Sequence, residues 1–292
     1  MSNSWRPYAD LHPGPGHTVV GDLRVLADVG GEGIPPRDVL VLLPAGAETS
    51  GLRYPVLYFH DGQNLFDAAT SFAGEWRIDE TMADLAAEGI EAIVVGIPNG
   101  GERRFGEYTP WPTGVHRFGS VAGAGGDHLR FLVEVVKPEV DTAFPTRRDA
   151  AATGILGSSL GGLMSAWAGV ERPDVFGLVG AMSPALGFGQ GRRLLRRLAA
   201  GQQQRRLPRP PLRLWIDTGD TEGGDGPGGA AASARWVVAA RGLRDALVAA
   251  GYREGVDLRY TEEPGAPHHE SAWARRLPDA LRFLLAEVRP NR

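Results

Sequence analysis

The chain has 292 residues, of which 42% are hydrophobic and 23% charged, which is enough apolar material for a sizeable core; the length suits two small domains or one large α/β domain. Its 31 Lys and Arg nearly balance 35 Asp and Glu, so the formal net charge of −4 gives no argument for nucleic acid or a membrane as partner. The absence of cysteine excludes disulfides, thiolate metal sites and cysteine nucleophiles. The N-terminus is polar and no apolar run could span a bilayer, so we expect a cytoplasmic protein.

Short β-rich runs alternate with amphipathic runs along the chain. The predicted strands are residues 17–27, 38–43, 55–60, 92–97, 151–156, 178–182, 212–217 and 256–261. The predicted helices are residues 75–87, 127–144, 160–170, 192–200, 231–250 and 272–288. Several strands are nearly continuous apolar runs, which is typical of parallel strands buried on both faces. The alternation predicts a single-domain α/β fold whose mostly parallel central sheet has helices on both faces and an antiparallel start.

The chain shows no internal repeat and no linker that would divide it before residue 187. We expect residues 1–16 to form an N-terminal extension and residues 17–292 a single α/β domain. Within this domain, residues 187–211 contain seven arginines and no acid. Such a charge run is usually a solvated helix face. The alternative is a cap segment that covers a pocket and attracts anionic molecules.

A glycine motif, Gly157-x-Ser159-x-Gly161, lies between a predicted strand and a predicted helix. This is the nucleophile-elbow pattern, in which the chain turns at once from strand to helix and exposes the serine oxygen at the helix N-terminus. The turn leaves no room for side chains two residues before or after the serine. Ser158 has leucines at those positions, so Ser159 is the predicted nucleophile. The alternative is a glycine-rich turn without chemistry, because such short motifs also arise by chance.

An activated serine needs a neutral imidazole as base and a carboxylate that orients the imidazole. In the fold that uses this elbow, the chain order is Ser, acid, His. Only His268 and His269 follow Ser159, in a loop between the last predicted strand and the last helix, so both are candidates for the base. The alternative is a pair of solvent-facing loop histidines. His60 precedes the serine and is expected to be structural.

The acid is expected after the strand at 212–217. Asp220, Glu222 and Asp225 follow that strand, whereas Asp217 still belongs to it. Neither chain order nor spacing chooses among the three carboxyl groups that follow, and all three stay candidates at this point.

The loop after the strand at 55–60 reads His-Asp-Gly-Gln-Asn at 60–64. In this fold, one oxyanion donor is the N–H group after the nucleophile and the second comes from such an early loop. Gly62 lets the backbone approach a substrate closely. The predicted donors are therefore the backbone N–H groups of Leu160 and Gln63, and the chemistry needs no metal and no organic cofactor.

Several motifs together resemble one family of α/β-hydrolases. They are Tyr-Phe-His-Asp-Gly-Gln-Asn-Leu-Phe-Asp at 58–67, Ile-Val-Val-Gly-Ile-Pro-Asn at 93–99, Glu-Tyr-Thr-Pro-Trp at 107–111, the glycine motif at 157–162 and His-His-Glu-Ser-Ala-Trp at 268–273. Over residues 18–288 the chain is similar to the putative-esterase family, which includes esterase D-like, enterochelin esterase-like, feruloyl and acetylxylan esterases and mycobacterial mycolyltransferases. The resemblance implies a serine carboxylic-ester hydrolase that acts on a small-molecule ester.

The resemblance also implies roles for individual residues. The family's terminal motif resembles His-Asn-Glu-x-x-Trp with the first His as base, which points to His268 and puts His269 where Asn is usual. A strand-end motif, Asp-x-Gly-x-x-Glu, implies Glu222 as the acid, with Asp220 and Asp225 still open in an unusually glycine-rich loop. The Asp-Gly-Gln match supports Gln63 as an oxyanion donor.

Two departures from the family pattern bear on the substrate. Residues 186–189 read Leu-Gly-Phe-Gly where relatives often have tryptophan in the pocket wall. Because the predicted catalytic domain begins near residue 17, we expect no N-terminal β-sandwich of the kind that enterochelin esterases carry, which weakens a siderophore assignment.

The predicted reaction is two-step acyl transfer to water through an acyl-enzyme on Ser159. Acyl transfer to an alcohol or sugar acceptor and an enterochelin-type trilactone esterase are the alternatives within the family. The alternative that is not an enzyme is a non-catalytic binding protein with a hydrolase fold. The natural acyl and alcohol groups and the oligomeric state do not follow from the sequence.

Overall fold

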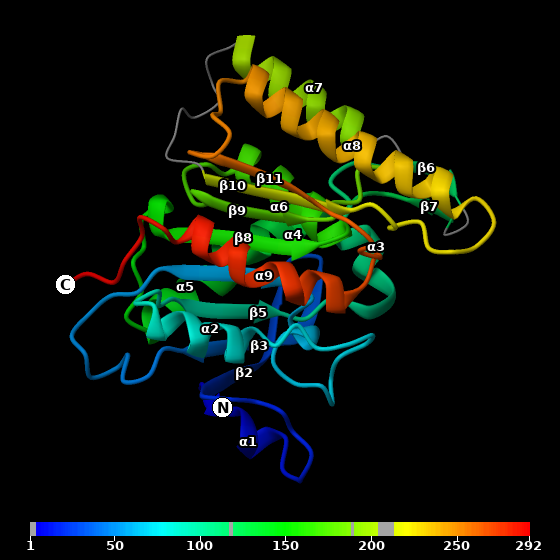
Figure 1. Cartoon of the computed structure of the whole chain (residues 1–292). Coiled ribbons are helices and arrows are strands. Elements are labelled where there is room, and N and C mark those ends of the chain that lie inside the picture. Colours follow the sequence, from blue (N-terminus) through cyan, green and yellow to red (C-terminus); the bar gives the residue numbers. More distant parts are fainter. Residues whose placement is uncertain (1–3, 117–118, 188–189, 204–212) are drawn as a thin grey trace.

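The computed structural model describes residues 4–116, 119–187, 190–203 and 213–292 (Figure 1). In this part of the chain, nine strands form one sheet in the order β1-β2-β3-β5-β4-β8-β9-β10-β11. They are β1 (Arg6–Pro7), β2 (Asp22–Gly31), β3 (Ile34–Leu43), β4 (Val56–His60), β5 (Ile93–Ile97), β8 (Thr153–Ser158), β9 (Leu178–Met182), β10 (Arg213–Gly219) and β11 (Leu258–Glu263). Neighbouring strands are antiparallel from β1 to β5 and parallel from β5 to β11. The predicted α/β fold is confirmed.

Helices cover both faces of the sheet (Figure 1). One face carries α2 (Ile78–Ala87) and α9 (Glu270–Leu284). The other face carries α4 (Gly125–Phe131), a π-helical turn (Leu132–Val136), α5 (Lys137–Ala143), α6 (Leu160–Glu171), α7 (Gln190–Gln203) and α8 (Gly229–Ala249). Short elements are α1 (Tyr8–Leu11), α3 (Arg104–Glu107), 3-10 turns at Gly62–Asn64, Gly101–Arg103 and Ala150–Ala152, and a hairpin of β6 (Thr113–His116) and β7 (Gly119–Val121).

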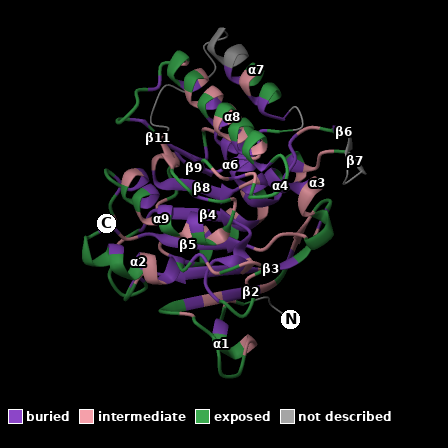
Figure 2. Cartoon of the chain, turned by 45° about the vertical axis from the view of Figure 1, so that its right-hand side comes forward, coloured by how far each residue is buried: buried purple, intermediate pink, exposed green. Residues whose placement is uncertain are grey.

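Alternate residues of the central strands fill two separate cores. In β4, Val56 and Tyr58 pack into the core beneath α4 to α8, whereas Leu57 and Phe59 pack into the core beneath α2 and α9. Successive side chains of a strand point to opposite faces, so a strand covered on both sides must be apolar at every position. Figure 2 shows these strands buried at the centre of the molecule.

The first residues of the chain join the sheet. Arg6–Pro7 pairs with β2, and the buried Tyr8 donates a hydrogen bond of 2.7 Å to the Asp67 carboxylate. The strand predicted from residue 17 begins only at Asp22. Before that point, the Thr18 hydroxyl donates a hydrogen bond to Glu75, which lies in the loop that precedes α2. This stretch therefore contacts that loop and is not part of β2.

The strand predicted over 38–43 extends back to Ile34. Two prolines, Pro35 and Pro36, argue against a strand there, because proline has no N–H to donate. The register between β2 and β3 shifts between Val29 and Gly31, and the two prolines fall between the paired residues at this irregularity. The sequence of this segment alone does not predict that a register shift accommodates the two prolines.

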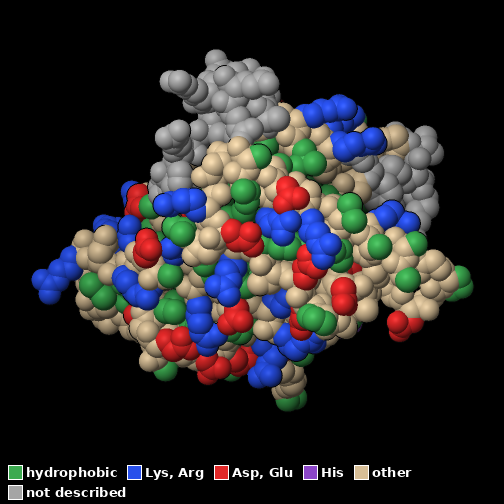
Figure 3. Space-filling model, turned by 45° about the horizontal axis from the view of Figure 1, so that its top comes forward, with side chains coloured by type: hydrophobic (Ala, Val, Ile, Leu, Met, Phe, Trp, Pro, Cys, Tyr) green, Lys and Arg blue, Asp and Glu red, His purple; other side chains and the backbone are tan. Residues whose placement is uncertain are grey.

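The described surface carries mixed charge. On the face shown in Figure 3, Lys and Arg side chains are interspersed with Asp and Glu. Ion pairs such as Arg241–Glu262 at 2.6 Å and Arg282–Glu88 at 2.6 Å account for part of this mixture. No helix within the described ranges has the length and apolar character needed to cross a membrane.

Candidate active site

Ser159 lies at a sharp turn between β8, which ends at Ser158, and α6, which begins at Leu160. Its backbone has φ 55° and ψ −119°, a strained conformation that persists only where the surroundings enforce it. A Cβ added at Gly157 would lie 2.9 Å from the Gly161 carbonyl carbon, and one at Gly161 would lie 3.0 Å from His60 Cβ. The two glycines are therefore required by the packing of the turn, as the motif predicted.

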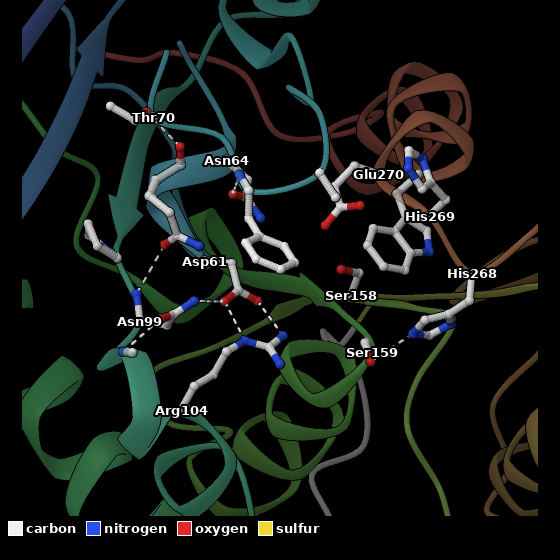
Figure 4. A pocket seen from close by; sticks show the side chains of 16 residues that line it. Asp61, Asn64, Thr70, Asn99, Arg104, Ser158, Ser159, His268, His269 and Glu270 are labelled. Carbon is white, nitrogen blue, oxygen red and sulfur yellow. Dashed lines mark hydrogen bonds and ion pairs between the residues drawn. The ribbon is translucent and has the colours of Figure 1, made fainter. Parts of the chain in front are cut away.

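Three residues far apart in the sequence meet at this turn. His268 Nε2 lies 2.8 Å from Ser159 Oγ (Figure 4). On its other side, His268 Nδ1 forms a short hydrogen bond with the Glu222 carboxylate. Glu222 follows β10, and His268 lies between β11 and α9. Because β8, β9, β10 and β11 are parallel neighbours, their carboxyl ends meet at one edge of the sheet.

Glu222 is the acid that contacts His268, and its side chain is fully buried. Burial raises the pKa of Glu222, but hydrogen bonds from His268, Ser183 and the Gly219 N–H outweigh burial, so the pKa lies below its ordinary value. The carboxylate is therefore held ionised beside the imidazole.

The other candidate acids are engaged elsewhere or exposed. Asp220 accepts a hydrogen bond of 2.6 Å from the Gly265 N–H, and Asp225 is exposed on the glycine-rich loop. Asp217 lies within β10, as expected, and forms a buried ion pair with Arg276 at 3.1 Å. The geometry therefore selects one carboxylate from the three that the sequence left open.

A buried serine behind Glu222 was missed by sequence reasoning. Ser183 Oγ donates a hydrogen bond of 2.5 Å to Glu222 Oε1. Ser183 Oγ in turn accepts hydrogen bonds from Trp273 Nε1 at 3.0 Å and from Arg276 at 2.9 Å. Ser183 follows β9 and has φ 40°, and this positive φ has no signature in an Ala-Met-Ser-Pro sequence.

The second loop histidine has a structural role at the start of α9. His269 is the N-cap residue of this helix, and its Nδ1 accepts a hydrogen bond of 3.2 Å from the Ser271 N–H. Its side chain is exposed, whereas the ring of His268 lies between the indoles of Trp236 and Trp273. Of the two predicted candidates for the base, only His268 contacts the serine.

The predicted oxyanion donors belong to two short turns beside the serine. Gln63 lies in the 3-10 turn at Gly62–Asn64, and Leu160 is the first residue of α6. No described residue accepts a hydrogen bond from either backbone N–H. A Cβ at Gly62 would lie 2.5 Å from the backbone of Gly96, so only glycine lets this turn pack against β5.

His60 lies buried beneath the elbow. Its Nδ1 is 3.3 Å from His128 Nε2, and its Nε2 has no hydrogen-bond partner among the described residues. Burial lowers the pKa of His60 to about 4, and its ring is therefore neutral at neutral pH. It supports the turn rather than reacting, in line with the structural role expected for it.

The serine opens into a pocket of about 800 Å³. Its lining residues are Asp61, Gln63, Asn64, Thr70, Phe72, Ala73, Pro98, Asn99, Gly101, Arg104, Ser158, Ser159, His268, His269, Glu270 and Trp273. The Asp61 carboxylate binds the Arg104 guanidinium through two hydrogen bonds of 2.7 and 2.8 Å (Figure 4). Burial lowers the pKa of Arg104, but the hydrogen bonds to Asp61 raise it by more, so the net shift is upward.

The arginines of α7 lie away from this pocket. Arg197 pairs with Glu171 at 2.7 Å, and Arg193 donates a hydrogen bond to the Pro112 carbonyl. None of the described residues of α7 lines the pocket. Arg205, Arg206 and Arg209, also part of the predicted cap segment 187–211, lie outside the described residues.

The chain resembles proteins of known sequence and structure. It is 24% identical over 255 residues to the uncharacterized protein YbbA of Bacillus subtilis, covering 87% of this chain and 94% of YbbA. An IroE-like serine hydrolase from Shewanella oneidensis has a TM-score of 0.67 at 20% identity, covering 89% of this chain and 79% of that one. The enterobactin esterase FES from Shigella flexneri has a TM-score of 0.70 at 18% identity, covering 92% of this chain and 60% of that one.

The parallel sheet and the serine elbow place the chain among the α/β-hydrolases. The family model for putative esterases matches residues 35–284, so the chain belongs to the putative-esterase family. The enzyme class predicted from the sequence, a carboxylic ester hydrolase, is confirmed by this membership.

Proposed function

We propose that this chain hydrolyses carboxylic esters through an acyl-enzyme on Ser159. The observation that carries the proposal is the continuous hydrogen-bonded chain from Ser159 Oγ through the His268 ring to the Glu222 carboxylate. A nucleophile, a base and an orienting acid in contact are what acyl transfer from an ester requires. Membership of an esterase family supports the same chemistry.

In the first half of the reaction, Ser159 Oγ attacks the ester carbonyl carbon while His268 Nε2 takes the hydroxyl proton. The ionised Glu222 stabilises the imidazolium that forms. The backbone N–H groups of Leu160 and Gln63 donate hydrogen bonds to the oxyanion. His268 then gives the proton to the alcohol oxygen, and the bond between that oxygen and the acyl carbon breaks.

In the second half, water takes the place of the alcohol. His268 removes a proton from the water as its oxygen attacks the acyl carbon, and then returns the proton to Ser159 Oγ as the carboxylic acid leaves. The cycle consumes one ester and one water, and the chain's own residues supply every proton transfer.

The substrate is a small-molecule ester that fits the pocket of about 800 Å³. Three structural relatives are described as an enterobactin esterase, a siderophore hydrolase and a ferulic acid esterase, which suggests a screen of trilactone siderophores, feruloyl esters, sugar acetates and S-formylglutathione. Added sugar or alcohol acceptors distinguish hydrolysis from acyl transfer, because transfer gives a new ester instead of the free acid.

Hydrolysis of short 4-nitrophenyl esters tests the assignment directly. Ser159→Ala should lower kcat by about four orders of magnitude or more, because the residual rate then comes only from binding and oxyanion stabilisation. Ser158→Ala, which removes the neighbouring pocket hydroxyl, is the matched control and should retain activity. Activity that survives in Ser159→Ala but not in Ser158→Ala would contradict the assignment. Separate His268→Ala and His269→Ala variants test the base in the same way.

A further inference from the structure

The pocket lining carries two carboxylates and one guanidinium, and therefore a net negative charge. The charged residues are Asp61, Arg104 and Glu270. Asp61 and Arg104 neutralise each other through their two hydrogen bonds, and Asp61 also accepts one of 2.7 Å from the Asn99 side chain. Among the described residues, none forms a hydrogen bond or ion pair with the Glu270 carboxylate. Arg104, which is paired with Asp61, acts on Glu270 only through space.

The fold holds Glu270 at the pocket wall, at the start of a helix. Glu270 is the first residue of α9, directly after the N-cap His269, and the helix N-terminus favours a negative charge there. Gly74 packs close by, since a Cβ on it would lie 3.6 Å from Glu270 Cβ. Figure 4 shows the Glu270 carboxylate directed into the pocket, on the side of Ser158 and away from the His269 ring.

Two aromatic side chains share the pocket lining with this carboxylate. Phe72, two residues before Gly74, is 90% exposed although it is a large apolar side chain. Trp273, one helical turn after Glu270, contributes an indole to the same lining. Aromatic faces attract cations through the ring quadrupole, most strongly where water is excluded. A carboxylate and aromatic rings in the lining of one pocket are the groups that bind an alkylammonium ion.

We propose that this pocket selects esters that carry a positive charge, an ammonium group above all, and that Glu270 determines this preference. The inference rests on the proposed ester hydrolysis and names its substrate class. It also predicts that anionic esters are poor substrates, since the one unpaired charge in the described pocket would repel them. The arginines of α7 do not counter this effect, because their described members lie outside the pocket lining.

Pairs of esters that differ only in charge test the proposal. Acetylcholine and 3,3-dimethylbutyl acetate have the same shape, with a nitrogen cation replaced by carbon, and place the charge on the alcohol side. The 4-nitrophenyl esters of 4-(trimethylammonio)butanoic acid and 5,5-dimethylhexanoic acid place it on the acyl side. For at least one pair, the parent should prefer the cation by about tenfold in kcat/KM, and 0.5 M NaCl should reduce the preference because salt screens the charge.

Glu270→Gln should bring that preference within about twofold, because it keeps the size of the side chain and removes its charge. Glu139→Gln removes the same charge from an exposed position of α5, outside the pocket lining, and should keep the parent's preference. Equal rates for both members of both pairs in the parent, or an unchanged preference in Glu270→Gln, would overturn the proposal.

Binding without turnover separates this inference from the proposed function. Titration calorimetry compares choline with 3,3-dimethylbutanol as ligands of the parent and of Glu270→Gln. If the parent binds choline more tightly than 3,3-dimethylbutanol and Glu270→Gln does not, cation selection is supported even if no ester is hydrolysed. In that case only the proposed function fails. Equal binding of choline and 3,3-dimethylbutanol, together with the absence of a charge preference in turnover, refutes cation selection while hydrolysis of 4-nitrophenyl esters still stands.

Discussion

Ser183 donates a hydrogen bond of 2.5 Å to Glu222 from the end of a neighbouring strand, although 39 residues separate the two in sequence. Each residue follows a strand, β9 and β10, and these strands are parallel neighbours. The bond completes a line from the nucleophile to the buried pair of Arg276 and Asp217. Glu222 is thus oriented from behind as well as by the imidazole in front of it.

Replacing Ser183 with alanine should therefore lower kcat/KM by about tenfold to a hundredfold, the range for a lost hydrogen bond to a charged group. The bond from Ser183 lowers the pKa of Glu222, so its loss raises that pKa, and the fall in kcat/KM that accompanies protonation of Glu222 moves to higher pH. Measurement of kcat/KM for 4-nitrophenyl acetate between pH 4 and 8 shows both effects.

Ser165→Ala is the matched control for that experiment. Ser165 is another fully buried serine, but its hydroxyl donates to the Gly161 carbonyl at 2.8 Å instead of to Glu222. A similar loss of activity in both variants, or an acid limb that does not move in Ser183→Ala, would mean that Ser183 acts only on stability.

Gly157→Ala should destabilise the fold by about 1–3 kcal/mol, the usual cost of overpacking, and should also lower kcat by displacing Ser159. Its added Cβ would lie 2.9 Å from the Gly161 backbone and 3.0 Å from His60 Cδ2. Urea unfolding measures the free energy. Gly126→Ala in α4 meets nothing within 4 Å and should be neutral or slightly stabilising, so equal effects of the two changes would refute the steric argument.

His60 makes the stability depend on pH. Burial lowers its pKa to about 4, against about 6.5 for an unfolded histidine, so only the unfolded chain takes up a proton as the pH falls through this interval. The free energy of unfolding should therefore decrease by about 3 kcal/mol on this account between pH 6.5 and pH 4, and stay at its full value above pH 6.5. His128, whose pKa burial also lowers, adds to the same trend.

Urea unfolding at pH 7.5, 6.0 and 5.0 tests this dependence. His60→Asn should flatten the pH dependence, whatever its effect on the stability at pH 7.5. His269→Asn changes an exposed histidine to another good N-cap residue and should leave the slope as in the parent. Parallel curves for the parent and His60→Asn would contradict the assignment.

Trp236 packs against the predicted base from outside the family motifs. The ring centroids of Trp236 and His268 are 4.6 Å apart. Trp273 packs edge-on against the same imidazole, with ring centroids 5.0 Å apart. Trp236→Ala should lower kcat/KM by about five- to tenfold, since an aromatic contact of this kind contributes roughly 1 kcal/mol. Trp236→Phe should stay within threefold of the parent. An undiminished rate in Trp236→Ala would show that the stacking does not orient His268.

Much of the fold follows from local pattern. The eight predicted strands all occur, because apolar runs of this length suit a sheet covered on both faces. Two ends were less predictable. β3 begins four residues early at Ile34, where a register shift accommodates two prolines, and the first β-strand of the chain forms only by pairing with β2. Both depend on the neighbouring strand and not on the segment itself.

The candidate site divides in the same way. Ser159 and its two glycines could be predicted because the strain of the elbow acts within five residues of chain. Chain order limited the base to two histidines, but three carboxylates stayed open until family resemblance favoured Glu222. In the structure, one of the three is buried against His268, one binds the Gly265 N–H and one is exposed. Such burial depends on packing between distant segments, which spacing alone does not encode.

The layered α/β architecture, the strained serine turn and the order of the reacting groups could be predicted from the chain, because each depends on backbone sterics or on the hydrophobic period along it. Contacts between distant segments establish which acid meets His268, that Ser183 supports this acid and that Glu270 has no hydrogen-bond or ion-pair partner among the described residues. These relationships join side chains brought together at the carboxyl edge of a sheet. Their energies come from burial and hydrogen bonding across that edge, and no single segment carries them.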